Sequence, residues 1–181
     1  MKQVITLFLI LAFAACGSLK VSYDYDKQAD FSKYKTYKFS EESLKLPIQQ
    51  LNRDRIITAV ESELAAKGFT KAESNADMLV DLNVKAEQRT EATATNTGGG
   101  MYGGYGMRYG YGGGYSTTQI SYDKYIDGTL FVSFVDNASQ KITWQGRATR
   151  TIDENASAEK REKNINYAVK EIFTKYPPAK K

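Results

Sequence analysis

The sequence predicts an α+β fold in which two amphipathic helices pack on one face of a mostly antiparallel sheet, as a two-layer sandwich. Three observations support this prediction. Several segments alternate apolar and polar residues with the period of a strand, two segments carry an apolar stripe with the period of a helix, and polar turns separate them. The expected order is β-β-α-β-β-β-β-α. With 181 residues, 41% of them hydrophobic, one domain can bury a core.

The clearest strand pair is expected within residues 125–151. Leu130, Val132 and Phe134 share one face of the first strand, and the polar run 136–141 is typical of a hairpin turn. The second strand alternates over residues 142–149. Trp144 falls on its apolar face with Ile142, Gly146 and Ala148, and Arg147 falls on the opposite, polar face.

Four further strands are expected. Residues 21–26 and 34–39 alternate around a turn at residues 30–32, so we expect these two strands to pair. Residues 77–86 alternate most regularly and continue into a polar tail at 88–97. Residues 116–122 form the remaining expected strand.

Two helices are expected, at residues 53–67 and 158–175. The first has Asn52 as its N-cap and Gly68 as its stop, and the second has Ser157 as its N-cap and is ended by Pro177. Their apolar stripes indicate faces turned to the core. These stripes contain Ile56, Ile57, Val60 and Leu64 in the first helix, and Ile165, Ala168, Val169, Ile172 and Phe173 in the second.

Residues 98–115 form a segment rich in glycine and tyrosine. Ten of the fourteen glycines and five of the thirteen tyrosines lie there. Ordering so many glycines costs backbone entropy, so we expect a disordered insertion within the domain. Tyrosine rings also suit glycan stacking or partner docking. The candidate binding residues here are Tyr102, Tyr105, Tyr109, Tyr111 and Tyr115.

The first 15 residues have the pattern of a signal peptide. Lys2 precedes an apolar run from Val4 to Phe13, and small residues lead to Cys16, the only cysteine. This stretch resembles a bacterial lipobox, and the resemblance implies lipidation of Cys16, with residues 16–20 as a tether and 21–181 as the domain. Gly17 stands where an aspartate often retains lipoproteins in the inner membrane, so we expect an outer-membrane anchor facing the periplasm.

Composition narrows the function classes. The chain lacks histidine, and its single cysteine excludes an internal disulfide and a cysteine-rich zinc site. The net charge of +4 is mild, and the basic residues are scattered between acids, which argues against nucleic-acid binding. We therefore expect no enzyme, no metal and no cofactor.

Six segments together resemble the domain-of-unknown-function 4136 family of bacterial lipoproteins. They are VSYDYD from Val21, DFSKYKTY from Asp30, ADMLV from Ala76, DGTLFVSFVD from Asp127, WQGRA from Trp144 and YPP from Tyr176. Their order covers nearly all of the chain after the signal, and residues 98–115 fall outside the pattern. The resemblance implies a fold and an envelope location but no reaction.

Three functional hypotheses follow. The leading one is a lipid-anchored module that binds an envelope protein, a glycan or peptidoglycan through the glycine- and tyrosine-rich segment and the polar sheet face with Arg147. Trp144 is a candidate for an aromatic pocket or for the core. The second hypothesis is a hydrolase that uses Asp24, Asp26 or Asp127. The third is a carrier of a small hydrophobic ligand between helices and sheet.

Overall fold

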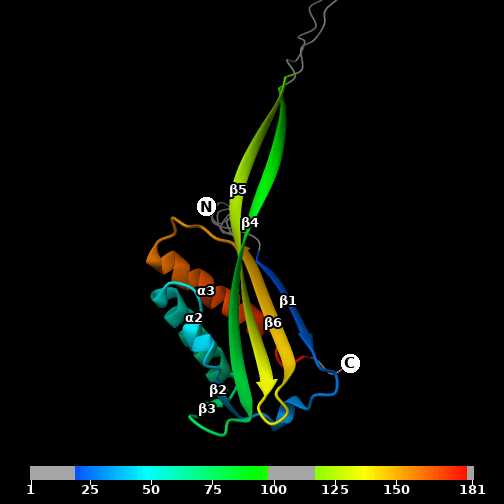
Figure 1. The fold of residues 1–181 in the computed structure, drawn as a ribbon, viewed down its shortest axis with the longest axis vertical. Coiled ribbons are helices and arrows are strands. Elements are labelled where there is room, and N and C mark those ends of the chain that lie inside the picture. Colours follow the sequence, from blue (N-terminus) through cyan, green and yellow to red (C-terminus); the bar gives the residue numbers. More distant parts are fainter. Residues whose placement is uncertain (1–18, 98–116, 179–181) are drawn as a thin grey trace, which may run out of the picture. The chain divides into compact units, whose positions relative to one another are not determined.

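The computed structural model describes residues 19–97 and 117–178 and shows an α+β fold with a six-stranded mixed sheet (Figure 1). Cys16 and the candidate tyrosines of residues 98–115 lie outside the described residues. The elements are β1 (Lys20–Tyr25), β2 (Thr36–Phe39), α2 (Gln50–Ala66), β3 (Thr70–Lys71), β4 (Met78–Thr97), β5 (Thr117–Asp136), β6 (Lys141–Thr151) and α3 (Ala158–Phe173), with 3-10 turns η2 (Phe31–Lys33) and η3 (Ser43–Lys45).

The strand order is β1-β6-β5-β4-β2-β3. β6 pairs antiparallel with β1 and β5, whereas β2 pairs parallel with β3 and β4. The sheet is therefore mixed, and the prediction of a mostly antiparallel sheet is wrong. The expected pairing of residues 21–26 with 34–39 is also wrong, because β1 joins β6 and β2 joins β4. The segment between β1 and β2 does not turn the chain back beside β1. It includes η2 and carries the chain to the other half of the sheet.

Two segments that were expected to be separate strands belong to a single strand, β5. β5 includes both 117–122 and 125–135, and β4 continues through the polar tail that was expected to follow it. β3 is a short strand that the sequence pattern did not indicate. The polar parts of β4 and β5 are rich in threonine, which favours strands without apolar alternation. Residues 85–95 and 118–125 are exposed, so no buried face marks them in the sequence.

The chain forms two compact units. The second unit comprises residues 88–97 and 117–126, the polar parts of β4 and β5. Within it, the Ser121 hydroxyl donates to the Thr93 carbonyl at 3.5 Å, and the Arg89 guanidinium lies 5.6 Å from the ring centroid of Tyr125. The first unit comprises the remaining described residues and contains the core.

α2 ends at the glycine that the sequence indicates, but it begins differently. Gly68 has a φ of +84°, and the amides of Gly68 and Phe69 donate to the carbonyls of Ala65 and Leu64, which closes α2. The prediction of Asn52 as N-cap is wrong. The carbonyl of Gln49 already accepts from two helical amides, so α2 begins at Gln50 without a capping side chain.

The start of α3 confirms the second cap. The Ser157 hydroxyl accepts from the Lys160 amide at 3.2 Å. Val169, Ile172 and Phe173 form the buried face of this helix. The helix ends at Phe173, two residues earlier than expected.

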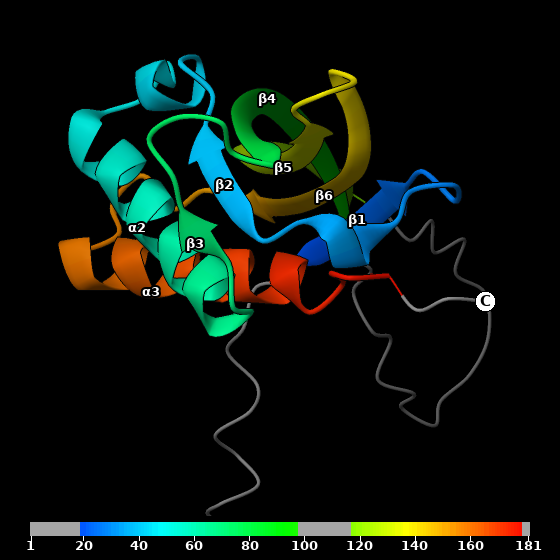
Figure 2. The same ribbon diagram turned by 90° about the horizontal axis from the view of Figure 1, so that it is seen from below.

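The core lies between the two helices and one face of the sheet. α2 and α3 contact each other on the same side of the sheet (Figure 2). The predicted inward faces of the strands are confirmed for most positions, because alternate residues of β4, β5 and β6 are fully buried. These residues are Met78, Val80, Leu82, Val132, Phe134 and Trp144. The prediction is wrong for Ile142, which is 55% exposed next to a register shift between β5 and β6.

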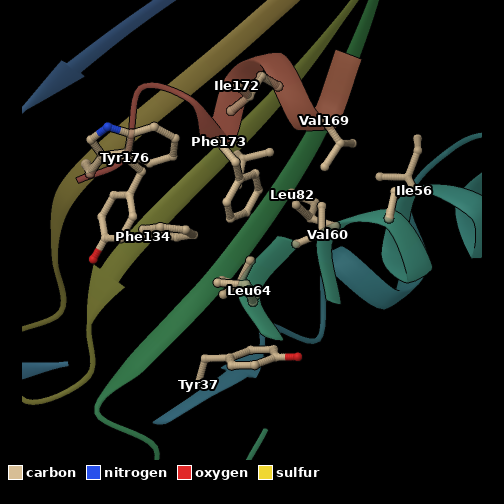
Figure 3. Packing of buried hydrophobic residues seen from close by; sticks show 14 of the residues in the cluster. Tyr37, Ile56, Val60, Leu64, Leu82, Phe134, Val169, Ile172, Phe173 and Tyr176 are labelled. Carbon is tan, nitrogen blue, oxygen red and sulfur yellow. The ribbon is translucent and has the colours of Figure 1, made fainter. Parts of the chain in front are cut away.

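Aromatic rings fill one end of this core. The Phe134 ring centroid lies 4.7 Å from that of Tyr176 and 4.9 Å from that of Trp144, and Phe173 packs beside them (Figure 3). Gly146 makes room for this cluster. A Cβ at Gly146 would lie 2.5 Å from the Trp144 ring and 2.6 Å from Ile172.

We predict that Gly146→Ala destabilises the fold by about 1–3 kcal/mol, because a methyl group there overlaps the Trp144 ring and Ile172. The measurement is the free energy of unfolding from denaturant titration. Arg147→Ala, an exposed change on the next residue, serves as control and should stay within about 0.5 kcal/mol of the original. An unchanged stability for Gly146→Ala would contradict the packing described here.

A buried carboxylate joins η2 to the hairpin between β5 and β6. Asp136 is 5% exposed, and its carboxylate accepts from the Lys33 ammonium at 2.5 Å, the Tyr34 hydroxyl at 2.9 Å and the Ser139 amide at 2.8 Å. The bond from Lys33, followed by the bond from the Ser139 amide, holds the pKa of Asp136 well below its ordinary value of 3.8. The sequence indicated only a polar turn residue at this position.

We predict that Asp136→Asn lowers the free energy of unfolding at neutral pH by about 1–3 kcal/mol, because it weakens buried hydrogen bonds. Since the pKa of Asp136 is lowered by folding, its contribution is fully present above the ordinary value of 3.8 and is lost as the pH falls toward the folded-state pKa. The variant should therefore lose less stability than the original between about pH 5 and pH 3.

The control for this prediction is Asp54→Asn, which changes an exposed carboxylate on α2. It should leave the pH dependence of unfolding as it is in the original chain. Equal slopes for the original chain and Asp136→Asn would show that this carboxylate does not stabilise the fold.

Candidate functional site

A pocket of about 680 Å³ opens between the sheet and the first turns of both helices. Its volume lies within the range of roughly 300–1,000 Å³ that is typical of small-molecule sites. Apolar side chains form most of its wall. They are Leu19, Pro47, Ile48, Ile56, Val84, Leu130, Ile165 and Ala168.

The pocket exists because side-chain size changes along the inner face of β5 and β6. Across these strands Phe134 pairs with Trp144, Leu130 with Ala148, and Gly128 with Arg150. Large rings fill the space under the first pair. Under the next pair, Ala148 is too small to reach the helices, so that end of the core stays open, whereas the Ile152 side chain lies against Gly128.

Two arginines stand at the rim. Arg150 donates from Nη1 to the amide oxygen of Asn164 on α3 at 2.8 Å. Arg161 donates from Nε to the Ala156 carbonyl at 2.9 Å and from Nη2 to the Glu154 carbonyl at 2.7 Å. Each of these bonds goes to an uncharged oxygen. Both side chains are partly exposed and line the pocket.

Two other charged residues of the rim, Asp153 and Lys85, have partners of opposite sign, and Glu154 adds an exposed carboxylate. Asp153 accepts from the Lys160 ammonium at 2.8 Å, and this bond, followed by one from the Asn155 amide, lowers the pKa of Asp153. The Lys85 ammonium lies 2.5 Å from the Glu87 carboxylate. The rim therefore combines paired charges with two guanidinium groups whose hydrogen bonds end on neutral atoms.

The candidate residues from the sequence do not meet at this pocket. Trp144 is fully buried among the core rings, so its core interpretation agrees with the structure. Arg147 is exposed on the opposite face of β6, where its Nε donates to the Ser22 hydroxyl at 2.6 Å. Cys16 and the five candidate tyrosines lie outside the described residues.

The three hydrolase candidates do not form one site. Asp24 lies opposite Gln145, and Asp127 lies opposite Thr151, six residues further along β6. Six residues of strand span about 20 Å, more than the 5–10 Å between paired catalytic carboxylates. Asp24 and Asp26 are exposed and accept from the amides of Tyr25 and Gln28, and Asp127 accepts from the Thr151 hydroxyl.

Sequence reasoning missed the residues that make the pocket. Arg150 continues the inner row of Trp144 and Ala148, but the strand expected from the sequence ends at residue 149. A charged residue on an apolar row is the signal that could have been noticed. Gly128 gives no such signal, because only its strand partner shows which face it serves.

The described residues contain neither a helix that could span a membrane nor a group of side chains of the kind that holds a metal ion. Within residues 19–97 and 117–178, no helix has the length and apolar character needed to span a membrane. In the same part of the chain, no group of three or more histidine, cysteine, aspartate or glutamate side chains is placed to hold a metal ion.

Comparison with solved structures finds similarity at low sequence identity. A PDZ domain protein from Parabacteroides distasonis superposes with a TM-score of 0.52 at 15% identity, over 99% of this chain and 41% of that one. The chain thus spans less than half the length of that protein. A PelC dodecamer from Paraburkholderia phytofirmans gives a TM-score of 0.45 at 11% identity, over 88% of this chain and 96% of that one.

The family model gives the more specific result. No curated protein matches the chain. A model described as a domain of unknown function, DUF4136, matches residues 21–178, which is most of the chain and agrees with the resemblance seen in the sequence. The chain belongs to the DUF4136 family.

Proposed function

We propose that this chain is a non-enzymatic binding protein of the cell envelope whose pocket takes a small, largely apolar ligand. The observation that carries the proposal is the open end of the core, where about 680 Å³ between helices and sheet is lined mainly by apolar side chains. The fold acts in this proposal as a two-layer sandwich with the ligand held between its layers.

Envelope attachment rests on the sequence around Cys16. A lipid on this residue would hold the domain at the membrane. We expect the anchor to lie in the outer membrane and the domain to face the periplasm. Intact mass of the native product tests this part. It should correspond to a chain that begins at Cys16 and carries acyl groups. A chain that keeps residues 1–15 without added mass would overturn the anchor and leave the pocket proposal standing.

The outer face of the sheet is the weaker candidate surface. Arg147 is exposed there, but neighbouring polar groups already bond each other. Gln145 donates to the Ser133 hydroxyl at 2.8 Å, and the hydroxyls of Thr129 and Thr149 lie 2.9 Å apart. Binding of a protein, glycan or peptidoglycan on this face stays a prediction. The hydrolase hypothesis loses support, because its carboxylates are separated along the sheet.

We predict that the chain binds the neutral apolar fluorophore N-phenyl-1-naphthylamine at one saturable site, and that Ala168→Phe weakens this binding by about tenfold or more. Ala168 lines the pocket from α3, so a phenyl ring there occupies the space that the fluorophore needs. Fluorescence titration measures both dissociation constants.

The matched control is Ala65→Phe, the same change at an exposed position of α2 that does not line the pocket. It should bind as the original chain does, with similar unfolding transitions for all three proteins. Unaltered binding by a folded Ala168→Phe variant would show that the fluorophore sits elsewhere.

A further inference from the structure

We infer that the ligand of this pocket is a free single-chain carboxylate, a fatty acid, with its head group on the Arg150 guanidinium and its tail along the apolar wall. This inference rests on the proposed function and names the class of its ligand. It follows from where Arg150 lies, from the charges around it and from the shape of the space beside it.

The position of Arg150 is the first step. It follows Trp144 and Ala148 on the inner row of β6, and it lies opposite Gly128, so its side chain leaves the sheet on the face that the helices cover. A guanidinium on an apolar row is costly unless an anion or several hydrogen bonds compensate it. The bond from Arg150 in this structure goes to the neutral amide of Asn164.

The surrounding charges are the second step. Among the described lining residues, Lys85 is paired with Glu87, Asp153 is paired with Lys160, and the carboxylate of Glu154 is exposed. Arg161 donates to backbone carbonyls, and its charge also acts on Asp153. Arg150 is thus the rim cation best placed to take a further anion. Its planar fork matches a carboxylate in a two-bond arrangement.

The shape of the space is the third step. Leu130, Ile56 and Ile165 line the same pocket as Arg150 and provide an apolar wall beside the guanidinium. A ligand with one anionic head and one apolar tail satisfies both parts. A carboxylate brings a single charge, which one arginine balances, whereas a phosphate head brings about −1.5 to −2 and needs a second cation.

The test compares dodecanoate, dodecan-1-ol and dodecyl phosphate by isothermal titration calorimetry. It uses the full chain with Cys16→Ala, so that no attached lipid competes. We expect dodecanoate to bind about tenfold more tightly than the alcohol and more tightly than the phosphate, because the head group adds charge-assisted hydrogen bonds. Arg150→Gln should remove the preference for dodecanoate over the alcohol.

Arg147→Gln is the matched control, since it makes the same change on the other face of the same strand. It should retain the full preference. If the chain that keeps both arginines binds dodecanoate and the alcohol equally, the carboxylate inference is overturned, but the apolar pocket is not. Tighter binding of the phosphate would also overturn it. Absence of binding by all three compounds would overturn the proposed function as well. The comparison within the unaltered pocket does not depend on the folding of Arg150→Gln.

Discussion

The packing of Trp144 against Phe134 on the inner face of the sheet is the contact on which the core depends. These two residues are strand partners with ring centroids 4.9 Å apart, and Phe173 and Tyr176 from the C-terminal segment close over them. Gly146 has no side chain and so leaves room for the indole ring in this arrangement. Because the rings hold α3 against one end of the sheet, the small residues at the other end leave a gap under the helices.

The mixed sheet depends on carboxylates that fix the chain where it crosses between strands. Asp136 holds the η2 turn through Lys33 and Tyr34. Asp77, just before β4, accepts from the amides of Lys35 and Thr36 at 3.0 and 2.8 Å, and these bonds lower the pKa of its carboxyl. The two carboxylates together place β2 beside β4, at a distance from β1 that no pattern within β1 or β2 specifies.

The sequence was sufficient to predict most of the local structure but not which strands pair with each other. Alternation identified the inner rows of β4, β5 and β6, and the glycine at residue 68 and the serine at 157 marked helix ends, because these signals act within a few residues. The pairing of β2 depends on carboxylates from distant segments, the buried Asp136 and the exposed Asp77. The pocket depends on how side-chain volumes add up across three elements, so Gly128 and Ala148 acquire their role only in the assembled fold.

The proposed function and the carboxylate inference both require that the open end of the core exchanges solvent for ligand while the aromatic end stays closed. Methyl-resolved NMR during titration with dodecanoate tests this requirement most directly. The account predicts saturable shifts at the methyl groups of Ile48, Ile56, Leu130 and Ile165, which line the pocket, and little change at Leu64 and Val80 at the closed end. Shifts that spread over both ends, or that never saturate, would contradict it.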